Sequence, residues 1–355
     1  MIIGCVGFSW SGSSAVTDLL SEYDDNQILR DEFIFAYHPD SLSDLDFHLN
    51  TECSKFLSSI VSIPRFKKVC DLLLKKYLKS NLKKIVNNYL DGLIQAQWVG
   101  DCQGQILLRN AFVYDFFGQR VMSRRILPKL SYKFSRKNKI YPLSNMYFSI
   151  KPEHFIEKTQ LFTDEILKAI GFNLEKNIVL DQPFPGNAPS RTMQYYRNSR
   201  AIIVDRDPRD LYILVKHVFK NSCYSIPIDN VEDFVVYYKQ MHSTLSNEIN
   251  NPHILYLKFE SLIYEYTKTV GLIEKFLDLK RTTEMGKYFN PNESIVNTQL
   301  FKKIKLYDDD IKYIEKELAE FLYDFESFSI APDQLKQMSF FDENPKTSGR
   351  KNRIK

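Results

Sequence analysis

Short apolar runs, each bounded by turn residues, recur along the chain and predict strands. Five runs show this pattern: Ile2–Phe8, Ile28–Ala36, Ile178–Asp181, Ala201–Val204 and Ile254–Phe259. Runs that are almost wholly apolar are typical of strands covered on both faces, as in a parallel sheet. Helical spacing of apolar residues follows three of them, at Ser14–Leu20, Pro208–Phe219 and Ser261–Leu277. Strands that alternate with helices predict an α/β fold with a parallel sheet.

The interval from residue 39 to residue 171 has a different pattern, with few strand-like runs. Apolar residues between Phe66 and Leu93 trace one helical face, and Pro64 suits the first turn of a helix. We therefore expect a large, mainly helical insertion at 39–171 within the α/β core.

The core then comprises residues 1–38 and 172–330. Near its end a further helix is expected from Asp308 to about Phe325, with Asp308 as a plausible N-cap. The remaining residues, 331–355, are polar and basic and predict a tail outside the packed core.

Composition excludes several classes of protein. Hydrophobic residues make up 44% and aromatic residues 14% of the 355 residues, enough for a sizeable core, which excludes wholesale disorder. The five cysteines are scattered and contain no C-x-x-C pair, so neither a disulfide framework nor a zinc site is expected. No signal-peptide pattern opens the chain, and no apolar run reaches about 18 residues. We therefore expect a cytoplasmic protein.

The loop after the first predicted strand carries candidate chemistry. The chain has only 12 glycines, yet Gly4, Gly7 and Gly12 all fall within its first 12 residues. Glycines and serines between a buried strand and a helix expose backbone N–H groups at the positive end of the helix dipole, which favours anion binding. The spacing of Gly7 and Gly12 matches the start of a P-loop, but Ser13 stands where the NTPase lysine belongs. An ordinary strand–helix turn capped by serine is the alternative.

A second strand also ends in anion-binding chemistry. The run Ala201–Val204 continues as Asp205-Arg206-Asp207-Pro208-Arg209-Asp210 and enters a helix. In parallel sheets ligands bind beyond the carboxyl ends of the strands, and arginine there suits bidentate phosphate contacts. The alternative is that Arg206 and Arg209 pair with the neighbouring aspartates.

Together, these two segments resemble the family of sulfotransferases that use 3′-phosphoadenosine 5′-phosphosulfate (PAPS), including bacterial-type carbohydrate sulfotransferases. There, a loop of the form G-x-x-[RK]-S-G-[ST]-[ST] holds the 5′-phosphosulfate, and a strand ending in R-[ND]-P-x-D holds the 3′-phosphate. Ser11-Gly12-Ser13-Ser14 and Arg206–Asp210 match these patterns in order, and Phe259-Glu260-Ser261-Leu262 matches a third, [YF]-E-[DS]-L. The resemblance implies a P-loop-like sulfotransferase core that binds PAPS and requires no metal.

Three positions depart from or extend the family pattern. Trp10 stands where most members have Arg or Lys beside the sulfate, and Leu214 stands where a serine usually adds a contact to the 3′-phosphate. A basic C-terminal loop of the family falls at about Asn297–Lys305. Lys302, Lys303 and Lys305 are therefore candidates to replace the missing cation, although a Lys-rich segment is commonly a solvated face.

The resemblance also implies a general base at the end of the third predicted strand. Asp181 occupies the matching position, and Gln182 follows it. A carboxylate there can take the proton of the acceptor hydroxyl; the alternative is a turn-forming aspartate that introduces the Pro183–Gly186 loop. Glu32, at the end of the second predicted strand, is the rival base. The six histidines show no metal spacing, and most are expected on the surface or on helices.

The insertion suggests the acceptor. Residues 55–84 and 120–139 each carry a local charge of +8, so with a net charge of +4 the rest of the chain carries −12. A basic lobe with interleaved aromatic residues suits an anionic glycan, a glycolipid or an anionic membrane surface. A solvated helical hairpin is the alternative, and no nucleic-acid-binding signature appears.

The sequence therefore predicts a PAPS-dependent sulfotransferase that acts on a hydroxyl of a carbohydrate or glycolipid. Its predicted donor-binding residues are Trp10, Ser11, Gly12, Ser13, Ser14, Arg206, Lys302 and Lys303. A P-loop small-molecule kinase and a non-catalytic nucleotide- or glycan-binding protein are the alternatives.

Overall fold

The computed structural model describes residues 1–51, 54, 57–78, 81–100, 144–219, 225–281, 286–326 and 328. The chain divides into two compact units. The first contains Met1–Ile34, Leu174–Met193 and the chain from Asn198 onward, and the second contains Phe35–Asn173 and Gln194–Arg197.

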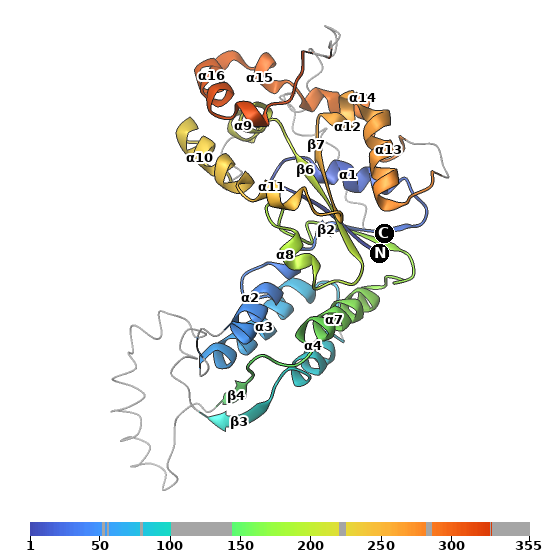
Figure 1. Cartoon of the computed structure of the whole chain (residues 1–355), viewed down its shortest axis with the longest axis vertical. Helices are drawn as coiled ribbons and strands as arrows, with labels where there is room; N and C mark the ends of the chain where they lie inside the picture. The colour runs from blue at the N-terminus through green and yellow to red at the C-terminus, as the bar shows by residue number, and fades with distance from the viewer. Residues whose placement is uncertain are drawn as a thin grey trace. The chain divides into compact units, whose positions relative to one another are not determined.

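A parallel sheet forms the centre of the first unit (Figure 1). Its strands are β1 (Ile2–Gly7), β2 (Asn26–Glu32), β5 (Asn177–Asp181), β6 (Ser199–Asp205) and β7 (Ile254–Lys258). Their order is β2-β5-β1-β6-β7, and every neighbouring pair is parallel. The predicted α/β fold with a parallel sheet is confirmed.

The second predicted strand differs from expectation. We expected a strand buried on both faces at Ile28–Ala36, but β2 ends at Glu32 and its residues are half-buried or exposed. Ile34–Ala36 form a short 3₁₀ helix, η1. Because β2 lies at the edge of the sheet, it has a neighbouring strand on one side only.

One face of the sheet packs against α1 (Ser13–Leu20), α12 (Ser261–Tyr264) and α13 (Tyr266–Leu277). Strands and helices share one apolar cluster, whose members include Ile3, Cys5, Val16, Leu19, Val179, Ile202, Leu257, Val270 and Ile273. The helix predicted at Ser261–Leu277 is thus two helices, interrupted at Glu265, whose φ of −119° and ψ of 35° are not helical.

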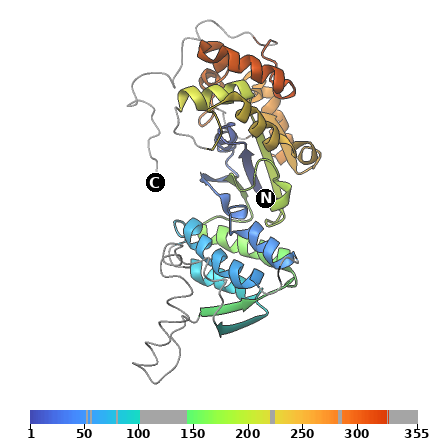
Figure 2. The same cartoon turned by 90° about the vertical axis from the view of Figure 1, so that its left-hand side faces the viewer.

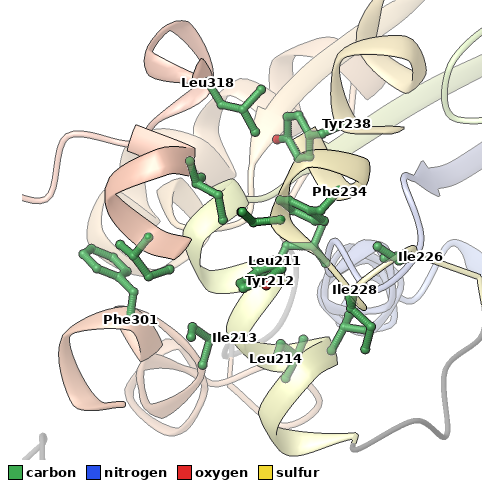
Figure 3. Packing of buried hydrophobic residues seen from close by; sticks show 14 of the residues in the cluster. Leu211, Tyr212, Ile213, Leu214, Ile226, Ile228, Phe234, Tyr238, Phe301 and Leu318 are labelled. Atoms are coloured by element: carbon green, nitrogen blue, oxygen red, sulfur yellow. The ribbon is translucent and has the colours of Figure 1, made fainter. Parts of the chain in front are cut away.

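A second apolar cluster lies among helices of the same unit (Figure 3). It joins α9 (Pro208–Ile213), the π-helix η4 (Leu214–Val218), α10 (Val231–His242), α15 (Leu300–Lys303) and α16 (Asp308–Glu317). Leu214 is 4% exposed and packs within it, so the family's serine position is a core position in this chain. The N-cap of α16 is Tyr307 rather than Asp308, which instead adds a negative charge to the first turn and favours the helix dipole.

The remaining elements of the first unit are short. They are α8 (Ser190–Met193), α11 (Leu245–Glu248), α14 (Pro291–Ser294), η5 (Ile295–Asn297), η6 (Lys305–Tyr307) and η7 (Ala319–Phe321).

The second unit is built mainly of helices (Figure 2). Those in the described part of this unit are α2 (Leu42–Asn50), α3 (Leu57–Leu74), α4 (Leu82–Asp91) and α7 (Phe155–Ile170). Aromatic side chains pack between them, and the rings of Tyr89 and Phe162 stack with centroids 4.2 Å apart. Pro64 lies inside α3 rather than in its first turn, which corrects the prediction. The pattern also did not predict the antiparallel pair of strands β3 (Ala96–Gly100) and β4 (Ser144–Phe148), because β3 is largely exposed.

Part of the predicted basic surface lies outside the described residues. The segment 120–139 and the tail 331–355 are not described, and the segment 55–84 is described in part. Among the residues that the structure describes, no helix is long and apolar enough to cross a membrane.

Candidate functional site

The loop from Phe8 to Gly12 joins β1 to α1 and is held by close backbone packing. The Ser11 Oγ atom accepts a hydrogen bond from the Phe8 N–H at 3.0 Å and donates one to the Val204 carbonyl at 2.6 Å. A Cβ atom on Gly7 would come within 2.1 Å of Ser11 Oγ, so glycine is required beneath the loop. Gly12 has φ 100°, and a Cβ there would lie 2.5 Å from the Phe259 ring. Because the single hydroxyl proton of Ser11 is used inside the protein, residue 11 can donate to an anion only through its backbone.

The start of α1 is tied to the neighbouring strand by Gln182. The side-chain oxygen of Gln182 accepts from the Gly7 N–H at 3.4 Å, and its amide nitrogen donates to Ser13 Oγ at 2.8 Å. Ser13 is buried and Ser14 is exposed at the first turn of α1. The two serines therefore flank the positive end of the helix dipole, where anions bind favourably.

Arg206 lies against this loop from the end of β6. The residue is only 4% exposed, and its guanidinium donates to the carbonyl oxygens of Trp10, at 3.4 Å, and Asn297. It also stacks over the Phe259 ring at 4.9 Å. The Nε atom is buried and has no hydrogen-bond partner among the described residues. Burial lowers the pKa of Arg206.

The alternative of simple ion pairing applies to Arg209 and not to Arg206. Arg209 contacts Asp207 at 2.7 Å and Glu315 at 3.0 Å. Among the described residues, no ion pair joins Arg206 to a carboxylate. Arg206 thus remains a buried cation whose charge is not neutralised by direct contact with a carboxylate.

Trp10 forms the exposed part of the loop. Its side chain is 46% exposed, and its ring lies 4.2 Å from the Phe219 ring, between centroids. Both Ser9 and Trp10 have positive φ, 49° and 57°, a conformation that is uncommon for residues other than glycine. The Arg206 guanidinium donates a hydrogen bond to the Trp10 carbonyl, so the buried arginine is bound directly to the loop backbone.

The segment from Ile295 to Lys303 reaches the same place. The Asp210 carboxylate accepts from the N–H groups of Gln299, at 2.7 Å, and Leu300, at 2.6 Å, and so fixes the start of α15. Lys303 Nζ donates to the Val296 carbonyl at 2.9 Å, one residue before the Asn297 that binds Arg206. Burial lowers the pKa of Lys303.

The predicted lysines differ in orientation. Lys303 is half-buried and faces the turn that Arg206 also contacts. Lys302 is exposed, and its Nζ lies 5.9 Å from the centroids of the Phe301 and Phe325 rings. Lys305 is exposed and approaches Asp308 at 3.9 Å. Of the three, Lys303 has the contacts closest to Arg206.

The two candidate bases lie on adjacent strands. Glu32 in β2 stands opposite Asp181 in β5 in the sheet register. The Asp181 Oδ1 atom is buried and has no hydrogen-bond partner among the described residues. Burial, together with the negative charges of Glu32 and Asp18, raises the pKa of Asp181 to about 7. Glu32 itself is exposed.

Asp205, the last residue of β6, centres a buried network that sequence analysis did not identify. Its carboxylate contacts Lys258 Nζ at 2.7 Å, Tyr256 OH at 2.6 Å and His242 Nε2 at 3.1 Å. Tyr238 donates to it at 3.1 Å and lies 2.9 Å from the Arg206 carbonyl. Burial alone would raise the pKa of Asp205, but Lys258 and His242 outweigh it and hold that pKa well below its usual range.

His242 links this network to the anion loop. Its ring stacks between Phe8, at 4.1 Å, and Tyr238, at 4.0 Å between centroids. The expectation that most histidines lie on the surface or on helices fits His242 only in part, since it lies on α10 but is buried. The alternation of Tyr256 and Lys258 on one face of β7 was a usable signal, whereas nothing in the sequence linked His242 to Asp205.

The third motif of the sequence resemblance, Phe259-Glu260-Ser261-Leu262, packs beneath the loop. Glu260 is fully buried and accepts from the Asp207 N–H at 3.0 Å. Burial, followed by the charges of Asp207 and Asp210, raises the pKa of Glu260 to about 8. Phe259 supports Gly12 and Arg206, so this motif buttresses the other two.

Comparisons with known proteins give only distant similarities. Neither a protein-family model nor a curated protein matches the sequence. Among solved structures, a sulfotransferase domain from the curacin biosynthetic pathway is similar with 12% identity, covering 91% of this chain and 98% of that one, at a TM-score of 0.40.

Two further structures are similar to this chain. Sulfotransferase STF1 from Mycobacterium tuberculosis H37Rv shares 12% identity over 90% of this chain and 76% of that one, with a TM-score of 0.35. Retinol dehydratase, solved with androsterone and the inactive cofactor PAP, shares 11% identity over 94% of this chain and 83% of that one, with a TM-score of 0.31. Because these similarities are so distant, activity has to be inferred from the residues of the site.

Proposed function

We propose that this chain is a sulfotransferase that moves a sulfuryl group from PAPS to a hydroxyl acceptor. One observation carries the proposal: three segments identified from sequence meet at Arg206. Its guanidinium contacts Trp10 in the anion loop, 196 positions away, and Asn297 in the lysine-bearing segment, 91 positions away. An arrangement that gathers a helix N-terminus and a buried cation at the carboxyl end of a parallel sheet suits a donor with two separate phosphates.

The residues of the site fit such a donor. In this proposal the 5′-phosphosulfate lies at the start of α1, against the backbone of Ser11 and Gly12 and the hydroxyls of Ser13 and Ser14. The 3′-phosphate lies near Arg206, whose buried Nε has no partner among the described residues. A phosphate oxygen would satisfy that atom and neutralise the buried charge.

Two departures from the family pattern shape the donor site. Trp10 brings no cation to the sulfuryl group, and Leu214 is buried in the helical core. We propose that Lys303 supplies the nearest substitute charge, because it approaches the turn held by Arg206. Lys302 is assigned a weaker contribution, because its recorded contacts are with the Phe301 and Phe325 rings rather than with that turn.

In the proposed reaction Asp181 is the general base. The acceptor hydroxyl oxygen attacks sulfur as its proton passes to the Asp181 carboxylate. The bond between sulfur and the 5′-phosphate oxygen breaks, and the electron pair leaves with adenosine 3′,5′-bisphosphate. A pKa raised to about 7 matches a base that works near neutral pH. Glu32 raises that pKa and remains the rival for the role.

We propose a carbohydrate or glycolipid hydroxyl as the acceptor, bound through the helical unit. That unit presents cations and aromatic rings at its surface: Lys76 Nζ lies 4.5 Å from the centroid of the half-buried Tyr77 ring, and Trp98 is 42% exposed. Cations attract anionic glycans or an anionic membrane surface, and aromatic rings can stack on sugars. A cytoplasmic location, with peripheral contact to such a membrane, completes this proposal.

A thermal-shift experiment tests the donor. A ligand that binds only the folded protein raises its melting temperature. Adenosine 3′,5′-bisphosphate should stabilise the protein more than AMP or ATP with Mg²⁺. A larger shift with ATP and Mg²⁺ would favour a kinase, and the absence of any shift would overturn the proposal. With PAPS bound, Glu32→Gln should retain turnover if Asp181 is the base.

A further inference from the structure

Gln182 joins the two halves of the site, and the proposed reaction does not yet use it. It directly follows Asp181, and its own N–H donates to the Cys5 carbonyl at 2.9 Å. Its φ is 53°, in the left-handed region that residues other than glycine rarely adopt. Strained backbone of this kind is found preferentially at functional sites, where surrounding contacts maintain it.

The direction of each hydrogen bond to the Gln182 amide is determined by its partner. The Gly7 N–H can only donate, so the atom 3.4 Å from it is the amide oxygen. The amide nitrogen then faces Ser13 Oγ, at 2.8 Å, and can only donate to it. Ser13 Oγ is therefore an acceptor in this contact, and its own proton has no acceptor among the described residues.

We propose that Gln182 is a positioning residue that orients the Ser13 hydroxyl as a donor to a bound anion. By occupying a lone pair of Ser13 Oγ, the amide turns the hydroxyl proton toward the start of α1. The nearby Arg206, only 4% exposed, hydrogen-bonded to the Trp10 carbonyl of this loop and with an unpartnered Nε among the described residues, independently indicates that an anionic ligand binds beside the loop; in the proposed donor Arg206 meets its 3′-phosphate and Ser13 its 5′ end. The identity of the anion, an oxygen of the 5′-phosphosulfate, rests on the proposed function.

The same residue relates the base to the donor. Gln182 contacts both Gly7, where the loop begins, and Ser13, where α1 begins. Asp181 is its immediate neighbour, and the pairing of β5 with β1 and β2 holds the Asp181 backbone, so Gln182 stands between the candidate base and the anion loop. Gln182 thus positions the Ser13 hydroxyl without touching the reacting atoms.

Two substitutions separate hydrogen-bond direction from mere packing. Gln182→Glu keeps the size and can still accept from Gly7, but its carboxylate can only accept, so Ser13 must turn its proton away from the anion. Gln182→Asn keeps an amide and tolerates positive φ, but it is one methylene shorter and cannot reach both partners.

Ligand binding can be measured by the fluorescence of Trp10, which lies in the loop. The chain has two tryptophans, Trp10 and Trp98, so Trp98→Phe leaves Trp10 as the one tryptophan in the loop. In that background, Gln182→Glu should weaken binding of adenosine 3′,5′-bisphosphate by about 10- to 100-fold, the loss of one hydrogen bond to a charged group plus a new repulsion. The deficit should shrink as pH falls, because the introduced carboxyl group, once protonated, can donate to Ser13 again.

A double-mutant cycle gives a readout that a purely structural role would not move. With Ser13→Ala present, Gln182→Glu should cost far less affinity than it does with Ser13 intact. Additive losses, or an unchanged affinity in a well-folded Gln182→Glu protein, would overturn the inference. Near-ultraviolet circular dichroism of each variant shows whether it folds. If Gln182→Glu does not fold, Gln182→Asn takes its place in the same cycle with Ser13→Ala.

Inorganic pyrophosphate separates this inference from the proposed function. If the nucleotide does not bind but pyrophosphate does, and Gln182→Glu weakens it, the donor assignment is wrong and the role of Gln182 stands. If pyrophosphate binds equally to both proteins, the role of Gln182 is wrong whatever the nucleotide does. If neither ligand binds, both proposals fail.

Discussion

Asp205 and Asp181 end two parallel strands of the same sheet, and the charges that surround their carboxylates are opposite in sign. Asp205 ends β6 and receives hydrogen bonds or ion contacts from Lys258, His242 and two tyrosines. Asp181 ends β5, faces the negative charges of Glu32 and Asp18, and keeps Oδ1 without a partner among the described residues. The pKa of Asp205 is held well below its usual range, and that of Asp181 is raised to about 7.

This difference in surrounding charge suits the two aspartates to different roles, one structural and one in proton transfer. A carboxylate surrounded by cations and hydrogen-bond donors has a structural role. The Asp205 carboxylate binds Tyr238, which contacts the Arg206 carbonyl, and His242, which stacks on Phe8. A carboxylate that is partly desolvated and uncompensated can exchange a proton near neutral pH. Identical side chains at equivalent strand ends therefore have different roles because their neighbours differ.

The largest expected effect is the loss of turnover in Asp181→Asn. An amide cannot take the acceptor proton, so kcat should fall about 10²- to 10⁴-fold. Binding of adenosine 3′,5′-bisphosphate should be nearly unchanged, which calorimetric titration can check. If turnover survives in Asp181→Asn and disappears in Glu32→Gln, the base is Glu32.

Next in size is the loss of stability in Asp205→Asn. The substitution leaves the Lys258 ammonium and His242 without their carboxylate, and removing one partner of a buried pair typically costs about 3–5 kcal/mol. Urea denaturation should show this loss in the free energy of unfolding. A stable Asp205→Asn protein would contradict the role of Asp205 as an anchor.

The pH dependence of stability should differ in sign between the two residues. The folded pKa of Asp181 lies above its ordinary value of 3.8, so the folded protein holds the extra proton between about pH 4 and 7, and stability falls as pH rises through this window. Asp181→Asn should therefore be more stable than the wild type at about pH 8, by roughly 2–4 kcal/mol. The difference should vanish near pH 4.

Asp205 makes the opposite contribution. Its lowered pKa means that its stabilisation is complete above the unfolded value and is lost as pH falls through the acidic range. The deficit of Asp205→Asn should thus be largest at neutral pH and shrink in acid. Burial also raises the pKa of Glu260, to about 8, and of Asp210, to about 7, so only differences from the wild type isolate each aspartate.

The smallest expected effect is that of Tyr256→Phe. It removes one hydrogen bond to Asp205 and leaves Lys258, His242 and Tyr238 in place, so the loss should be about 1–2 kcal/mol in unfolding free energy. Tyr238→Phe should cost more, because the one hydroxyl proton of Tyr238 is shared between the Asp205 carboxylate and the Arg206 carbonyl, and its removal leaves two buried acceptors without this donor. Equal losses would mean that this second contact contributes little.

Much of the first unit could be predicted from the sequence. The strand runs at Ile2, Ile178 and Ala201 were identified because a strand covered on both faces is apolar throughout. The run at Ile254 was also identified, although β7 is an edge strand with three half-buried residues. The antiparallel pair β3–β4 and the edge position of β2 were not predicted, since exposed strands carry mixed residues that resemble loops. The segments of the candidate site were predicted one by one, from turns, helix starts and charged residues. The contacts that bring these segments together were not predicted.

The sequence by itself determined the α/β fold and which loops lie at the carboxyl end of the sheet, because these follow from local hydrophobic periodicity and chain order. Tertiary structure alone decided what each polar group does. Gln182 meets Ser13 across 169 positions, and Asp205 meets Lys258 across 53. Whether a carboxylate is neutralised or left uncompensated depends on such distant partners and on burial, which no local pattern specifies.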